Sequence, residues 1–175
     1  MIVMAAAGFF IFVVCSILGW VWEVFLNILL CGVFTNRGIL YGPWLPIYGV
    51  GAVMVLIIAS NVSNPIQVFL ISAASCGLLE YLTSYVMEFI WKMRWWNYGG
   101  AWNVNGRINL LVILLFGCIG LFFHYFMVPR MGWIKINLAI PLKTLSTIIF
   151  VIMLADFIYS QIHPNISSIS SHHPF

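Results

Sequence analysis

The sequence contains very few charged residues, and this scarcity excludes most soluble folds. Only 6% of its 175 residues are Asp, Glu, Lys or Arg, whereas 63% are hydrophobic. Soluble domains are typically about 25% charged and about 45–50% apolar. A soluble fold of this length could not hide so much apolar surface, because small domains leave much of their surface in water. We therefore expect lipid to be the solvent for most of the chain.

Other missing features exclude further classes of function. The net charge of +3 is small and its residues are scattered, which argues against nucleic-acid binding. The four cysteines lie apart in apolar surroundings, without the spacing of metal sites or disulfides. The chain has neither a phosphate-binding glycine-rich loop nor a nucleophile-elbow pattern. The sequence therefore predicts no ATP hydrolysis, no metal and no cofactor, and it favours a protein that is not an enzyme without deciding the point.

Long apolar runs predict an all-α bundle of about five transmembrane helices. The runs are continuous and roughly 15 to 26 residues long, which is typical of membrane helices rather than of barrel strands. The first run lacks the basic segment of a signal peptide, so we expect a retained helix. Residues 161–175 are polar, and we expect a mobile tail after one transmembrane domain at residues 1–160. The expected helices are residues 4–31, 45–60, 66–91, 107–128 and 138–160.

Two connections are unusually long and are rich in Gly, Asn and aromatic residues. We call residues 32–46 the first loop and residues 92–106 the second loop. With five spans, both loops lie on the same side of the membrane. Loops that only join helices are usually short, so we expect these two to be structured and functional. Lys and Arg are slightly more frequent on that side, which favours a cytoplasmic position in a multi-pass cell-membrane protein.

Two segments of the chain resemble each other. Residues 19–23 and 84–88 both run small residue, aromatic, valine, bulky residue and glutamate. Each glutamate precedes one of the two loops, and an Asn, an Arg, a Gly and an Ile close both copies. The pattern suggests a parallel repeat of helix pairs one–two and three–four, as in some transporters. Coincidence in an apolar chain is the alternative.

All four acidic residues fall within or at the ends of expected helices. A charge near the bilayer centre costs at least about 2.5–3.5 kcal/mol, so these acids should face protein or water. Glu23 belongs to a polar stripe on the first helix, and Glu80 and Glu88 share one face of the third. Arg37 follows Glu23 in the first loop, and Arg107 lies across the second loop from Glu88. We expect ion pairs, because an arginine would stabilise each ionised glutamate.

These charges and the neighbouring aromatic side chains form the candidate site. Acidic and aromatic groups together suit a cationic ligand. Anchoring at the membrane interface is the alternative role for the rings, and purely structural ion pairing is the alternative for the charges. The candidate ligand-binding residues are Glu23, Arg37, Tyr41, Tyr48, Glu80, Tyr81, Glu88, Trp95, Trp96, Asn97, Asn103, Asn105 and Arg107.

Ordered motifs across residues 16–120 carry a family resemblance. They lie at residues 18–23, 36–43, 46–51, 80–88, 95–98 and 103–108. Together they resemble the bacterial ABC-transporter type IV permease family, although the family prefers Asp, Ser and Cys where this chain has Asn97, Gly99 and Asn109. The resemblance implies a bacterial inner-membrane subunit that works with a separate ATPase. About five spans are few for a translocation pathway, so a permease also implies a homo-oligomer or a partner subunit.

The leading hypothesis is therefore a transporter subunit with a polar site near the two loops. A membrane-embedded enzyme that acts on a lipid or another amphiphile, with a glutamate as general base, is a second hypothesis. A non-transporting accessory or sensor protein is a third. The sequence specifies neither the cargo nor the direction of transport.

Overall fold

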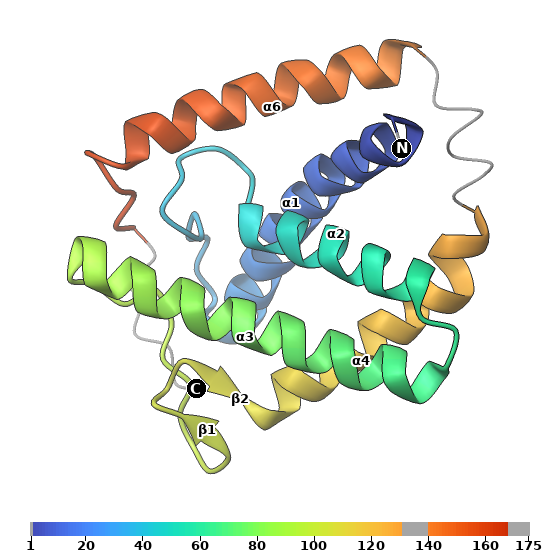
Figure 1. The fold of residues 1–175 in the computed structure, drawn as a ribbon. Helices are drawn as coiled ribbons and strands as arrows, with labels where there is room; N and C mark the ends of the chain where they lie inside the picture. Colours follow the sequence, from blue (N-terminus) through green and yellow to red (C-terminus); the bar gives the residue numbers. More distant parts are fainter. Residues whose placement is uncertain (1, 131–139, 168–175) are drawn as a thin grey trace.

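The fold consists of α-helices and one small β-hairpin (Figure 1). The structure is a computed structural model that describes residues 2–130 and 140–167, with side chains from residue 8 and, after the gap, from residue 144. The hairpin is antiparallel and pairs Asn103 with Asn109. The predicted all-α class is confirmed. The elements are α1 (Ile2–Cys31), α2 (Pro46–Asn61), α3 (Pro65–Trp91), β1 (Asn103–Val104), β2 (Ile108–Asn109), α4 (Leu110–Phe122) and α6 (Ile140–Ser160).

Three helices of the described residues are long and apolar enough to cross a membrane. They are Gly8–Cys31, Pro65–Trp91 and Leu110–Arg130, the last of which continues α4 through a π-helical and a 3₁₀ turn. Pro46–Asn61 and Thr144–Ser160 are apolar but shorter. The chain is therefore a membrane protein, and five complete spans remain a prediction.

The helix boundaries follow from local sequence signals. Pro46 and Pro65 each stand in the first turn of a helix, where a missing N–H is harmless. The Asn64 side chain caps α3 by accepting from the Ile66 N–H at 2.9 Å. Lys92 ends α3 in the left-handed conformation, with φ of 56°. The expected boundaries of the first three helices agree with the structure to within two residues.

The expected start of the fourth helix at residue 107 is wrong. Ile108 and Asn109 form strand β2, and the helix begins at Leu110. The Asn109 side chain accepts a hydrogen bond from the Leu111 N–H at 2.8 Å, which caps the helix. Arg107 thus lies in the turn of a hairpin rather than on a helix. The expected start of the fifth helix at residue 138 lies outside the described residues.

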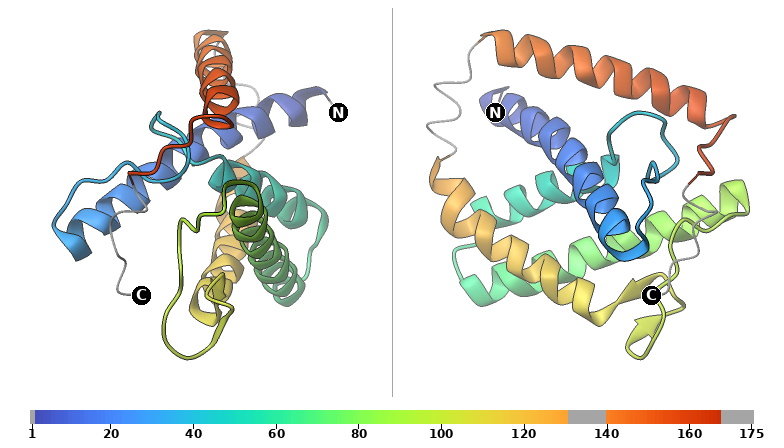
Figure 2. Two further views of the ribbon diagram at one scale, coloured as in Figure 1. Left: turned by 90° about the vertical axis from the view of Figure 1, so that its left-hand side faces the viewer. Right: turned by 180° about the vertical axis from the view of Figure 1, so that it is seen from behind.

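The helices pack through small residues, as is usual in membranes. Figures 1 and 2 show α3 beside α4, and α6 lying across α1 and the first loop. Gly49 of α2 contacts α1 at Ser16, and Gly120 of α4 contacts α3 at Ser72. An apolar cluster joins Leu40 and Trp44 of the first loop to Met153 of α6. The proposed superposition of the two helix pairs remains a prediction.

Replacement of Gly49 by Ala should destabilise the protein. The added methyl group would overlap the Ser16 hydroxyl and the Phe12 carbonyl oxygen. Overpacking of this kind costs about 1–3 kcal/mol, so the Tm of the purified protein in detergent should fall. Gly51→Ala is the matched control, because its new methyl group would make only ordinary contacts with Leu79 and Cys76. Equal Tm values for the two variants would contradict the α1–α2 packing.

Candidate functional site

The first loop is tied to α1 around Glu23. The Glu23 carboxylate pairs with the Arg37 guanidinium at 3.4 Å and accepts from the Tyr48 hydroxyl at 2.5 Å. One turn earlier, the Trp20 indole donates to the Asn36 side chain at 2.6 Å. Arg37 is 9% exposed, so its charge lies largely out of solvent beside that carboxylate. The predicted pairing of Glu23 with Arg37 is present.

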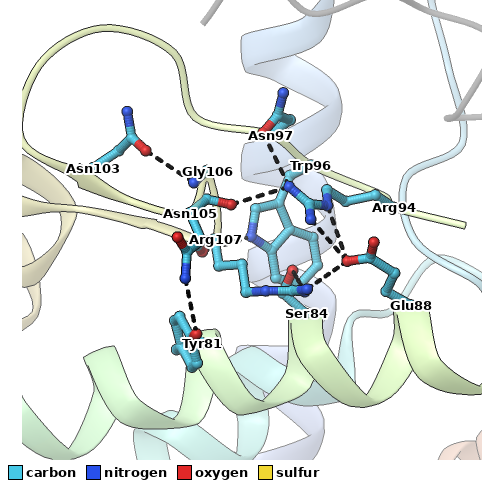
Figure 3. A network of polar contacts seen from close by, with 10 residues as sticks. All are labelled: Tyr81, Ser84, Glu88, Arg94, Trp96, Asn97, Asn103, Asn105, Gly106 and Arg107. Atoms are coloured by element: carbon cyan, nitrogen blue, oxygen red, sulfur yellow. Dashed lines mark hydrogen bonds and ion pairs between the residues drawn. The ribbon is translucent and has the colours of Figure 1, made fainter.

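The second loop is tied to the end of α3 around Glu88 (Figure 3). The same carboxylate oxygen of Glu88 pairs with Arg94 at 2.9 Å and with Arg107 at 2.5 Å. Arg107 also donates to the Ser84 hydroxyl at 3.2 Å and lies over the Tyr85 ring at 5.3 Å. The predicted pairing of Glu88 with Arg107 is present. Arg94 was not among the predicted site residues, although it stands only six positions after Glu88.

Four predicted site residues in and beside the hairpin shape the second loop. Figure 3 shows Trp96, Asn97, Asn103 and Asn105 around the turn that carries Arg107. The Asn103 side chain accepts from the Gly106 N–H at 2.8 Å, and the Trp96 indole donates to the Arg107 carbonyl oxygen at 3.0 Å. These contacts fix the backbone at Arg107 and so position its guanidinium.

The remaining contacts of this turn involve Asn97, Asn105 and Tyr81. Asn97 accepts from Arg94 at 3.3 Å, so its amide provides the acceptor that a carboxylate would provide at this position. Arg94 also donates to the Asn105 carbonyl oxygen at 3.0 Å. The Asn105 amide donates to the Tyr81 hydroxyl at 3.3 Å and connects the turn to α3.

Glu80 differs from the other acids because it has few partners. Glu80 is 8% exposed, and the Tyr98 hydroxyl donates a hydrogen bond to one oxygen of its carboxylate at 2.6 Å. The second oxygen, Oε2, is buried without a hydrogen-bond partner among the described residues. Burial, followed by the charge of Glu80 and the hydrogen bond to it, raises the pKa of Tyr98, so this phenol remains a neutral donor. Tyr98 was not among the predicted ligand-binding residues.

The clusters around Glu23 and Glu80 are close enough to interact. The charge of Glu23 also raises the pKa of Tyr98, and the charge of Arg37 lowers it. Glu80 belongs to a buried face of α3 on which Ser72, Cys76, Glu80 and Ser84 follow at steps of four residues. The Ser72 hydroxyl oxygen is likewise buried without a partner among the described residues. A polar stripe therefore runs along α3 and ends at the second loop.

Asp156 holds the first loop from the side of α6. Its carboxylate accepts from the backbone N–H groups of Tyr41 and Gly42, at 3.1 and 2.8 Å, and from the Trp44 indole at 2.8 Å. The Tyr41 ring is 52% exposed and lies 5.7 Å from the Tyr159 ring. Tyr41 was predicted as a ligand-binding residue, but its contacts place it with α6 rather than with the three glutamates.

The segment after α6 connects the two loops. The Asn165 amide donates to carbonyl oxygens of the first loop, the nearest being that of Leu40 at 3.1 Å. The Trp95 indole of the second loop donates to the Asn165 carbonyl oxygen at 3.3 Å. The sequence predicts a mobile tail from residue 161. Within that tail, Asn165 and Ser167 form hydrogen bonds to the first loop, and residues 168–175 lie outside the described residues. Trp95, predicted as a ligand-binding residue, thus contacts this segment.

The described residues contain no group of three or more His, Cys, Asp or Glu side chains that could hold a metal ion. The site is instead a set of paired charges, tyrosine hydroxyls and asparagine amides at the loop side of apolar helices. Such helices, with buried polar stripes, define an α-helical membrane protein.

The chain belongs to the family described as "Putative ABC-transporter type IV", whose model matches residues 10–161. This match extends over the spans, both loops and Asp156, and it confirms the resemblance in the sequence. No curated protein matches the chain, and no solved structure matches it either.

Replacement of Asp156 by Asn should release the first loop. The amide keeps one acceptor oxygen and loses the charge, and hydrogen bonds to charged groups contribute about 1.5–3 kcal/mol. Arg37 is buried in the wild-type protein. In the variant, cleavage by trypsin after Arg37 should therefore become roughly tenfold faster. Cleavage after Lys92 in the same molecules is the internal control and should change little. An unchanged rate at Arg37 would show that Asp156 does not hold this loop.

Proposed function

We propose that this chain is the membrane-spanning permease subunit of an ABC-type transporter, with a polar site at the loop side of α1, α2 and α3. The family match and the span-length helices support this proposal. The chain has no phosphate-binding loop of its own, so ATP hydrolysis belongs to a separate subunit.

The observation that carries the proposal is the buried polar stripe on α3. Glu80 is 8% exposed within a helix of otherwise membrane-like composition, and one of its oxygens has no partner in the described part of the protein. Ionisable groups inside membrane helices are expensive and usually mark a path for an ion or a substrate. A purely structural stripe would be expected to satisfy its buried polar atoms, as the cluster at Glu88 does among the described residues.

The two loops are the proposed docking surface for the ATPase subunit, and we place them in the cytoplasm. On the opposite side, the connection between α2 and α3 is only the turn at residues 62–64. The second loop exposes Trp102 to 78% and Val104 to 52%, and it also carries the basic residues Lys92 and Arg94. The small number of spans supports assembly as a homo-oligomer or with a further subunit.

Affinity purification from the native membrane after mild crosslinking tests this proposal. Mass spectrometry should recover a nucleotide-binding ATPase reproducibly with the tagged chain. Recovery of the chain alone, or only with itself, would contradict the permease proposal. Turnover of a lipid by the purified chain without ATP would instead favour a membrane-embedded enzyme.

Replacement of Trp102 by Ala should reduce the recovery of the ATPase several-fold without changing the Tm. Exposed tryptophans at interfaces often contribute 2 kcal/mol or more, by a rough estimate, to binding. Trp22→Ala is the matched control, because Trp22 is 53% exposed on the membrane-spanning part of α1 and its ring packs on Phe25 of the same helix. If both variants recover the ATPase as well as the wild type does, the loops are not its docking surface.

A further inference from the structure

Within the described part of the chain, Glu80 is the one acid that has neither a cationic partner nor a set of backbone donors. Glu23 pairs with Arg37, Glu88 pairs with Arg94 and Arg107, and Asp156 accepts from backbone N–H groups. Glu80 accepts only from the Tyr98 hydroxyl among the described residues. A single neutral donor does not replace the hydration of an ionised carboxylate, whose burial costs several kcal/mol.

The charges around Glu80 do not balance. Glu23, Glu80 and Arg37 all act on the Tyr98 hydroxyl, so they belong to one local group. When both carboxylates are ionised, the two carboxylates and one guanidinium leave this group with one negative charge. One additional positive charge would neutralise the group, and the free Oε2 of Glu80 is the oxygen available to bind it.

We propose that Glu80, together with Tyr98 and the neighbouring pair of Glu23 and Tyr48, binds a protonated amine group of the ligand. An ammonium group brings one positive charge and donates hydrogen bonds in several directions, so it can reach acceptor oxygens that belong to different helices. A metal ion would need several oxygen ligands at short distance, and the described residues offer no group of three or more potential metal-ligating side chains.

The position of Glu80 along α3 suits a transported cation. Glu80 lies eleven positions before Trp91, which is about 16 Å at the rise of an α-helix. Glu80 thus lies well inside the span-length helix Pro65–Trp91 rather than at its loop end, and transporters bind their substrates within such helices. The buried face with Ser72 and Cys76 on one side of Glu80 and Ser84 on the other extends the polar stripe in both directions.

The amine site names a class of cargo for the proposed transporter. Only the role of the amine as cargo rests on the proposed transport function; the binding of the amine does not. The binding test therefore uses the purified full chain without an ATPase. Its failure would remove the amine site and leave the recovery of an ATPase as a separate question.

Thermal unfolding in detergent tests the site with methylammonium chloride as the probe. Sodium chloride and tetramethylammonium chloride at equal concentration control for ionic strength and for a cation without N–H donors. The Tm of the wild type should rise saturably with methylammonium and much less with the two controls. Glu80→Gln should weaken this response at least about tenfold, because a charge-assisted hydrogen bond of about 1.5–3 kcal/mol is lost.

Two further variants separate binding from general destabilisation. Asp156→Asn makes the same chemical change on α6, and it should lower the starting Tm but keep the methylammonium shift. Tyr98→Phe removes one hydroxyl of the proposed site but keeps the charge of Glu80, so it should weaken the methylammonium shift by less than Glu80→Gln does. The proposal is wrong if methylammonium acts no better than sodium, or if Glu80→Gln responds as the wild type does. Loss of the shift in Tyr98→Phe to the same extent as in Glu80→Gln would also overturn it.

Discussion

A carboxylate on an apolar helix must find donors, and in this chain the donors come mostly from the loops. Arg37 of the first loop meets Glu23, and Arg94 of the second loop meets Glu88. Asp156 accepts from backbone groups of the first loop, and Tyr98 of the second loop reaches Glu80. All four acids of the chain therefore hold loop residues against helices. Because these bonds lie in partly or fully buried surroundings, they contribute more than exposed ion pairs would.

The same bonds hold both loops against the helices. Asn165 joins the two loops by contacting both Leu40 and Trp95. The loops thus form one ordered layer rather than two separate connections. Because this layer covers the buried carboxylate of Glu80, a partner protein that moves the loops would change the access of a ligand to Glu80.

Local sequence patterns predicted the parts of the site that depend on short separations. The pairing of Glu88 with Arg107 follows from the helix period and from a loop that returns to the same helix end. The bond from Asp156 to Gly42 could not be predicted, because it joins positions 114 residues apart and its donor is a backbone group. The hairpin was missed because the apolar run begins at Ile108, two residues before the helix itself. Its turn depends on Asn105 and Gly106 with positive φ, which hydrophobic periodicity does not register.

Hydrogen exchange of the wild-type protein in lipid nanodiscs tests most directly whether the carboxylates and the hairpin hold the loops. The backbone amides of Tyr41 and Gly42 donate to Asp156, and those of Tyr98 and Arg107 donate to carbonyl oxygens of the hairpin. These four amides should be strongly protected, at a level near that of the helix ends. Exchange of both sets at the rate of an unstructured peptide would contradict the account, because the loops would then be free of the helices.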